Sequence, residues 1–182
     1  MEAKKNNAYF KLQLISGSIL MSTVLYSAVL YFFYSINSIA LFESTDPLLI
    51  KARYGCLLAS ILIAFFLGLI YRYVFENGDL KSKIEKRTRY DEYRDLVDWS
   101  SKPVEGRVIR YYTKTTIVLM SIADIPGTLG LVLGILGQTF NVSALHLKYV
   151  IGLLVLSLVY KIALLPKERV LDFLKMRMET IT

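Results

Sequence analysis

The sequence has little of what most enzyme and metal sites use. Its 182 residues contain one cysteine, Cys56, and one histidine, His146. A single cysteine excludes a disulfide within the chain, and a lone histidine without neighbouring cysteines gives no metal-ligand set. We find no catalytic-triad pattern, no phosphate-binding glycine loop and no pair of carboxylates beside a base. The sequence therefore favours a non-catalytic protein and predicts neither a metal nor another cofactor.

Charged residues are also few, at 20% of the chain, whereas apolar residues reach 54%. The mean hydropathy is +0.45, and the apolar residues come in long runs rather than at amphipathic spacing. Runs of about 20 residues are long enough to cross a bilayer. Each such run must pair its own backbone polar groups and is therefore helical. The sequence thus predicts an all-α, polytopic membrane protein that forms a single domain over residues 1–182.

Four apolar runs are candidate membrane spans, at about residues 12–34, 54–73, 115–138 and 149–165. The first follows a basic start but is longer than a signal-peptide core of roughly 7–15 residues, so we expect an uncleaved span. A polar segment at 75–114 has two interpretations. It forms either a surface helix on lipid headgroups or helical extensions of the adjacent spans, joined by a turn near residues 100–103. An amphipathic tail is predicted at 166–182.

The basic residues, which give a net charge of +7, lie mainly at the N-terminus, in segment 75–114 and in the tail. The positive-inside rule then predicts that both termini and this segment are cytoplasmic, and we expect the bacterial inner membrane. No nucleic-acid motif accompanies these residues. The expected partners are the lipid bilayer and either other membrane subunits or further copies of the chain, and not nucleic acid. Four bases are candidates for binding lipid headgroups: Lys81, Lys83, Lys86 and Arg87.

One acid, Asp124, lies inside the third apolar run. It is about nine residues into the span, which is roughly 13 Å at 1.5 Å per residue and close to the middle of the bilayer. An acid there is costly and is a functional candidate by default. It has three open roles: to bind and release a proton or cation, to pair with a cation on another subunit, or to accept hydrogen bonds from a neighbouring helix. Pro126 removes a helical hydrogen bond and predicts a bend beside Asp124.

Glycines follow this acid on one flank of the predicted helix. Their spacings of three, four and three residues keep them on that flank, and two of them form a GxxxG pattern: Gly127, Gly130, Gly134 and Gly137. Small residues allow a second helix to approach closely, so we predict tight helix packing at this face.

The segment from Asp124 to Val132, which reads DIPGTLGLV, resembles the second helix of the ATP synthase c subunit, the rotor proteolipid. In that helix an acid is followed six residues later by Gly-Leu-Val, and the preceding polar loop is similar to residues 102–107. The resemblance implies that Asp124 is a proton- or cation-binding carboxylate. The long segment 75–114 and two further spans distinguish the chain from a rotor subunit. Its third span and residues 166–169 are also similar to small bacterial four-span membrane proteins.

Three functions follow from these patterns. The first is a non-catalytic membrane subunit that assembles through the glycine face, within a larger complex. The second is a proton- or cation-coupled membrane component in which Asp124 is the titrating carboxylate. The third is a lipid-binding or lipid-moving protein whose basic cytoplasmic segment gathers anionic headgroups.

Overall fold

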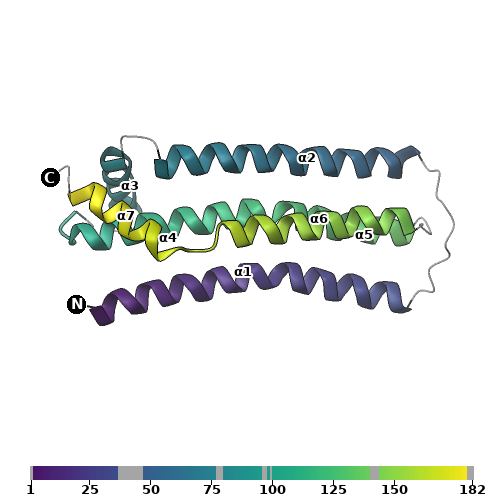
Figure 1. Ribbon diagram of the computed structural model, residues 1–182, viewed down its shortest axis with the longest axis horizontal. Helices are drawn as coiled ribbons and strands as arrows, with labels where there is room; N and C mark the ends of the chain where they lie inside the picture. The colour runs from purple at the N-terminus through teal and green to yellow at the C-terminus, as the bar shows by residue number, and fades with distance from the viewer. Residues whose placement is uncertain are drawn as a thin grey trace. The chain divides into compact units, whose positions relative to one another are not determined.

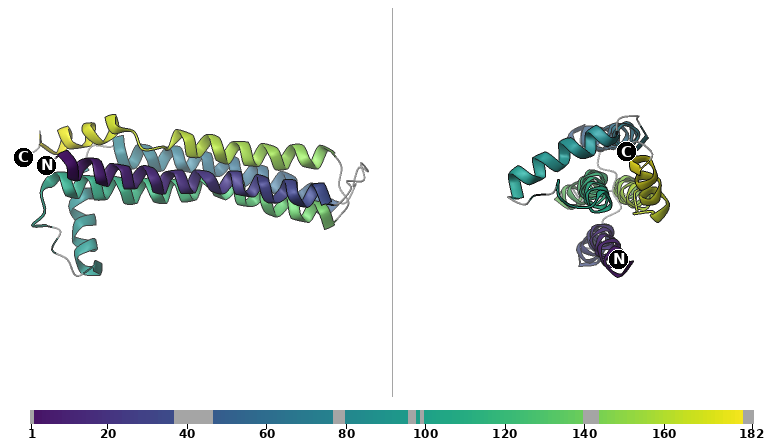
Figure 2. Two further views of the ribbon diagram at one scale, coloured as in Figure 1. Left: turned by 90° about the horizontal axis from the view of Figure 1, so that it is seen from below. Right: turned by 90° about the vertical axis from the view of Figure 1, so that its left-hand side faces the viewer.

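The computed structural model of the protein describes residues 2–36, 47–76, 80–95, 98, 100–139 and 144–179. Every regular element in these ranges is helical, as Figures 1 and 2 show, which confirms the predicted all-α class. In chain order the elements are α1 (Glu2–Ile36), α2 (Pro47–Tyr71), the π-helical turn η1 (Arg72–Glu76), α3 (Leu80–Asp95), α4 (Val104–Ala123), α5 (Ile125–Thr139), α6 (Ala144–Ala163) and α7 (Glu168–Glu179).

Four helical stretches are long and apolar enough to cross a membrane: Phe10–Phe32, Pro47–Phe75, Val104–Gly137 and His146–Ala163. They correspond to the four predicted spans and are compatible with an integral membrane protein. The third stretch begins earlier than predicted because Pro103 initiates α4. The Pro103 carbonyl accepts hydrogen bonds from the amides of Gly106 and Arg107 at 2.9 and 3.3 Å.

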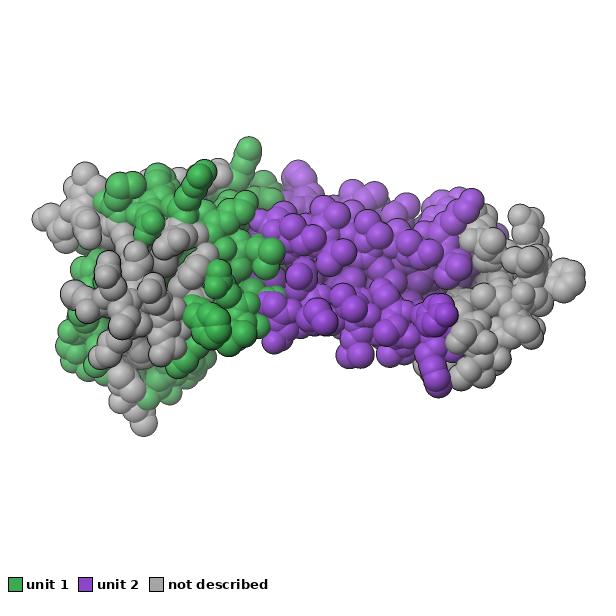
Figure 3. All heavy atoms as spheres, turned by 60° about the horizontal axis from the view of Figure 1, so that its bottom comes forward, with its two compact units in different colours: residues 1–16, 68–119, 165–182 green, residues 17–67, 120–164 purple. Residues whose placement is uncertain are grey.

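The chain forms two compact units, which are coloured separately in Figure 3. Unit 1 comprises Met1–Ser16, Gly68–Leu119 and Leu165–Thr182, and unit 2 comprises Gly17–Leu67 and Met120–Leu164. The polar segment and the tail therefore belong to unit 1, and Asp124 belongs to unit 2.

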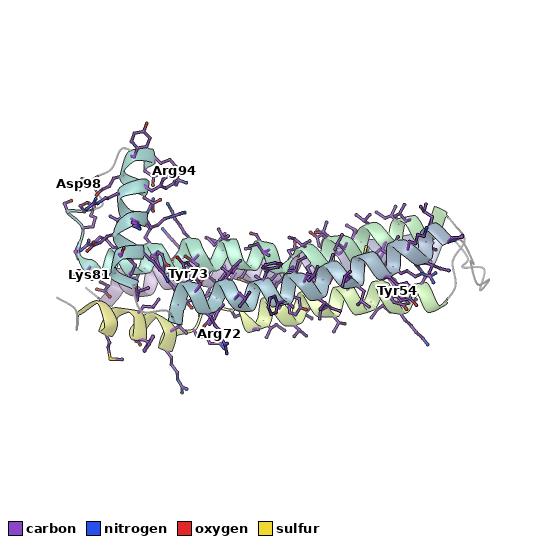
Figure 4. The ribbon with its side chains drawn as sticks, turned by 90° about the horizontal axis from the view of Figure 1, so that it is seen from above. Tyr54, Arg72, Tyr73, Lys81, Arg94 and Asp98 are labelled. Carbon is purple, nitrogen blue, oxygen red and sulfur yellow. The ribbon has the colours of Figure 1, made fainter. Side chains whose placement is uncertain are left out.

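In unit 1 the polar segment has features of both interpretations. A separate helix, α3, is present, and the turn at 100–103 leads directly into an extended α4. Four positions along one face of α3 are buried: Leu80, Ile84, Thr88 and Asp91. Figure 4 shows Arg94 and Asp98 at the opposite end of α3 from Lys81. Because its buried positions recur every three or four residues, α3 packs by one face and leaves the other face exposed.

The predicted amphipathic tail is helical from Glu168 to Glu179, and its last residues, 180–182, lie outside the described residues. Leu174 is fully buried, whereas Phe173 and Met176 are exposed. The backbone amide of Lys167 donates a hydrogen bond to the Tyr112 hydroxyl at 3.0 Å. This bond joins the start of α7 to α4 within unit 1.

In unit 2 the helices α5 and α6 pack against each other, side by side in the end-on view of Figure 2. Their core contains Leu133 of α5, with Leu30 contributed by α1 and a group of α6 side chains: Val150, Leu153 and Leu154. All of these side chains are buried. The contact is close because small residues of α5 lie at the interface.

The glycine face of α5 packs inside the chain. A Cβ atom added at Gly130 would lie 3.2 Å from Leu153 Cβ and 3.3 Å from the Val150 carbonyl oxygen. A Cβ atom at Gly134 would lie 2.5 Å from a methyl group of Leu30. The face on which the sequence predicted tight packing therefore contacts α6 and α1 of the same chain.

We expect Gly130→Leu to lower the free energy of unfolding by about 1–3 kcal/mol, because the new side chain meets a fixed carbonyl and a helix Cβ. Gly152→Leu, on the facing helix α6, is the matched control, since a Cβ there has no atom within 4 Å. Both changes replace a helical glycine with leucine, so the difference in helix propensity cancels. Thermal unfolding in mild detergent measures the effect. Equal stability of the two variants would contradict the close packing.

Candidate functional site: a buried aspartate–lysine pair

Asp124 lies where α4 ends and α5 begins. Pro126 has no amide hydrogen and cannot bond to the Ile122 carbonyl, so regular helical pairing is broken at this point. The next carbonyl along the chain, that of Ala123, accepts a hydrogen bond from a side chain of α6. The Oγ atom of Ser157 donates a hydrogen bond to the Ala123 carbonyl at 3.0 Å. The bend expected beside Asp124 therefore takes the form of an interruption between two helices.

Lys161 of α6 supplies the counter-charge of Asp124. Its side chain is 0% exposed, and its ammonium group forms an ion pair with Asp124 Oδ1. The same Nζ atom donates to the Ile19 carbonyl at 2.9 Å and to the hydroxyls of Ser22 and Thr23 at 2.7 Å each. The ammonium group is therefore held between α6, α1 and the α4–α5 junction, with an acceptor for each of its hydrogens.

The Asp124 carboxylate accepts two further hydrogen bonds from α1. Ser22 Oγ donates to Oδ1 at 2.9 Å, and the Tyr26 hydroxyl donates to Oδ2 at 3.0 Å. The Asp124 side chain is 20% exposed, in contrast to the fully buried Lys161. The carboxylate is thus the less buried member of the pair.

A buried pair of this kind is costly to form and costly to break. Removing two charges from water costs several kcal/mol for each, and only good geometry with additional hydrogen bonds repays that cost. In a membrane span, ionisable residues mark proton or ion sites, or pair with each other. Chemically, this arrangement can hold a proton on either residue, or place an incoming cation beside the carboxylate.

No protein-family model, curated protein or solved structure matches the chain.

The structure brings Asp124, Pro126 and the first glycine, Gly127, to the ion pair. A Cβ atom at Gly127 would lie 3.0 Å from Ser157 Oγ and 3.4 Å from a ring carbon of Tyr26. The absence of a side chain there lets both groups approach the α4–α5 junction. The remaining glycines continue along α5 away from the site, and Gly137 is buried.

The four residues predicted to bind lipid headgroups differ in how far they are engaged with other residues of the chain. Lys83 Nζ contacts the Tyr73 carbonyl and lies 3.9 Å from the centre of the Tyr73 ring. Arg87 Nε lies 3.7 Å from Asp91 Oδ1. Lys86 is exposed, and Lys81 is partly exposed. Lys83 and Arg87 are therefore engaged within unit 1.

A second polar cluster in unit 2 joins α2 to α6. Arg53 is 5% exposed and His146 is 0% exposed. Arg53 Nε donates to His146 Nδ1 at 2.9 Å, and His146 Nε2 lies 2.7 Å from the Leu133 carbonyl. This geometry assigns the ring hydrogen to Nε2 in a neutral imidazole. The structure places His146, fully buried, in the first turn of α6.

Sequence reasoning identified Asp124 but missed Lys161. Lys161 lies near the end of an apolar stretch that finishes at Ala163. Long lysine side chains in such positions ordinarily extend to the membrane surface, so the position alone does not mark a buried partner. The sequence feature that could have indicated this pairing is the presence of an acid, Asp124, and a base, Lys161, in separate apolar stretches of one chain.

Proposed function

We propose that the protein is a proton- or cation-coupled membrane component in which Asp124 is the titrating carboxylate and Lys161 its counter-charge. The observation that carries this proposal is the complete burial of the Lys161 ammonium against Asp124, between helices apolar enough to span a membrane. The partial exposure of Asp124 supports it, because a titrating group needs access to its proton or cation.

The exchange depends on charge balance within the pair. A proton that binds Asp124 leaves the ammonium of Lys161 buried without a counter-charge, and an isolated buried charge is strongly disfavoured. Uptake at Asp124 therefore favours release of a proton from Lys161 Nζ, which leaves a neutral acid beside a neutral amine. The Tyr26 hydroxyl, 3.0 Å from Oδ2, can relay a proton by donating its own and accepting another. Protonation of the amine and loss of the carboxyl proton restore the pair.

The proposal is tested by flux into liposomes that contain the purified protein. A pH-sensitive dye and a sodium-sensitive dye report proton and cation entry under an imposed potential. We expect flux with the natural sequence and loss of most of it in Asp124→Asn/Lys161→Met, which removes both charges together. Lys148→Met, an exposed position on α6, is the matched control and is expected to retain flux. Natural protein that conducts no better than empty liposomes, or a double variant that conducts normally, would overturn the proposal.

A non-catalytic membrane subunit is the second candidate. It is favoured by the complete set of hydrogen bonds around the ammonium, which suits a static cross-link between helices. The glycine face is occupied by the chain itself, so a partner would bind elsewhere. Exposed apolar side chains of α1 and α2 in unit 2, such as Met21, Leu25, Leu58 and Phe65, offer such a surface. Purification in gentle detergent at native expression level should then recover stoichiometric partner subunits, with no flux from the isolated chain.

A further inference from the structure

Unit 1 contains a cavity of about 240 Å³, lined by Glu85, Thr88, Arg89, Ser100 and Arg107. The first three of these residues lie on α3, Arg107 lies on α4, and Ser100 lies in the turn between the two helices. Because a water molecule occupies roughly 30 Å³ in the liquid, the cavity has room for a phosphate-sized group and several waters.

Two guanidinium groups line this cavity, and neither forms an ion pair with a carboxylate among the described residues. Arg107 Nε is buried and has no hydrogen-bond partner among the described residues. Arg89 forms no ion pair within the same part of the chain. Glu85 of α3 lines the cavity but forms no ion pair with either arginine, and Asp91 and Asp95 of the same helix pair with Arg110. A buried charged donor without an acceptor is unfavourable, so Arg107 favours an external anion.

We infer that this cavity binds a phosphate group through Arg89 and Arg107, with Glu85 accepting a hydrogen bond from the phosphate or from the group attached to it. The planar fork of arginine matches the oxygens of a phosphate, and two guanidiniums balance its charge. Glu85 adds selectivity because a carboxylate repels an anion that has no hydrogen to donate. Hydrogen phosphate has such a hydrogen, as do headgroups with a hydroxyl or amine beside the phosphate, whereas sulfate has none.

The first arm of the test uses free anions. Isothermal titration calorimetry on the purified full chain in neutral detergent compares inorganic phosphate with sulfate. We expect phosphate to bind about tenfold tighter or more than sulfate, and Glu85→Gln to remove most of that preference. Arg89→Gln and Arg107→Lys are each expected to weaken phosphate binding about tenfold. Arg107→Lys keeps the charge and loses only the fork, so it separates recognition from simple attraction.

The matched control is Lys102→Gln, which removes one positive charge from an exposed residue outside the cavity lining. We expect it to change phosphate affinity less than about twofold, as a surface charge does. Circular dichroism of each variant checks that the helices are retained, so that a loss of binding reports the site and not unfolding.

The second arm identifies the source of the phosphate. Nanodiscs of phosphatidylglycerol, which carries headgroup hydroxyls, are compared with nanodiscs of phosphatidylcholine, which has no hydrogen to donate. Retention of phosphatidylglycerol that depends on Arg107, seen by native mass spectrometry, would assign a lipid headgroup. Binding of inorganic phosphate alone would assign a soluble phosphate. Failure of both probes to bind, or an equal loss of binding in Lys102→Gln and Arg89→Gln, would overturn the inference.

Discussion

Asp124→Asn is expected to lower the free energy of unfolding by about 3–5 kcal/mol, the cost of leaving a buried charge without its partner. Asparagine keeps the shape of the side chain and can still hydrogen-bond to Ser22 and Tyr26, so charge is the main change. The Lys161 ammonium would remain fully buried against a neutral amide. Lys161→Met should cost less, because the remaining carboxylate is 20% exposed and keeps its two hydroxyl donors.

The double variant Asp124→Asn/Lys161→Met should be more stable than Asp124→Asn alone, since it leaves no unpaired charge. A double-mutant cycle, measured by unfolding in mild detergent, gives the coupling energy between the two residues. Lys148→Met controls for the removal of a lysine from α6 at an exposed position. An Asp124→Asn variant as stable as Lys148→Met would show that the ion pair does not stabilise the fold. Rescue of stability in a double variant that conducts no protons would separate folding from transport.

The second large effect is expected at Asp91. This residue is 1% exposed and accepts hydrogen bonds from Arg110 Nε at 2.9 Å and Lys114 Nζ at 2.6 Å. Asp91→Asn would leave two bases of α4 facing a neutral amide, which weakens the attachment of α3 to α4. We expect a loss of about 3 kcal/mol in the local stability of α3. Hydrogen exchange of the α3 backbone amides measures this stability directly. Glu85→Gln, on the same helix and without a described ion pair, is the matched control.

The ion pairs of Asp91 also predict that the local stability of α3 decreases in acid. Burial alone would raise the pKa of Asp91, but hydrogen bonds and charges from Lys114 and Arg110 outweigh burial and hold the pKa below its ordinary value of 3.8. A carboxyl with a lowered folded pKa contributes its full stability above the unfolded pKa and loses that stability as pH falls through the folded pKa. Protection of α3 should therefore decrease below about pH 4.

Asp91→Asn should remove part of this pH dependence. A remainder is expected because the Arg94 hydrogen bond also lowers the pKa of Asp95, which acts in the same direction. Amides of α3 that exchange equally slowly from about pH 6 to about pH 3, after correction for intrinsic exchange, would contradict the assignment.

The membrane-spanning helices could be predicted from the sequence because their length and apolar character are local properties. The same reasoning did not decide how α3 packs, because its buried face combines Leu80 and Ile84 with two polar residues, Thr88 and Asp91. That face is defined by the partners Arg110 and Lys114, which lie on another helix. Charge pairing across helices leaves no periodic apolar pattern, so two interpretations stayed open for this segment.

For the candidate site, the sequence identified Asp124 because an acid within an apolar run is conspicuous. It did not identify Lys161, whose role depends on the fold bringing α6 beside the α4–α5 junction. The same holds for Arg53 and His146, which lie far apart in sequence but only 2.9 Å apart between Nε and Nδ1. Tertiary contacts of this kind are not encoded in the residue types of any one segment.

The interruption at Asp124 also places the ends of two helix dipoles, those of α4 and α5, beside the ion pair. The Asp124 carbonyl accepts the Thr128 amide at 3.0 Å, which makes Asp124 the N-terminal capping residue of α5. The start of α5 carries roughly half a positive charge and the end of α4 roughly half a negative charge. In a continuous helix these partial charges would cancel. Here the positive end of α5 lies next to the Asp124 side chain, so the backbone contributes to the same electrostatic environment as the Lys161 ammonium.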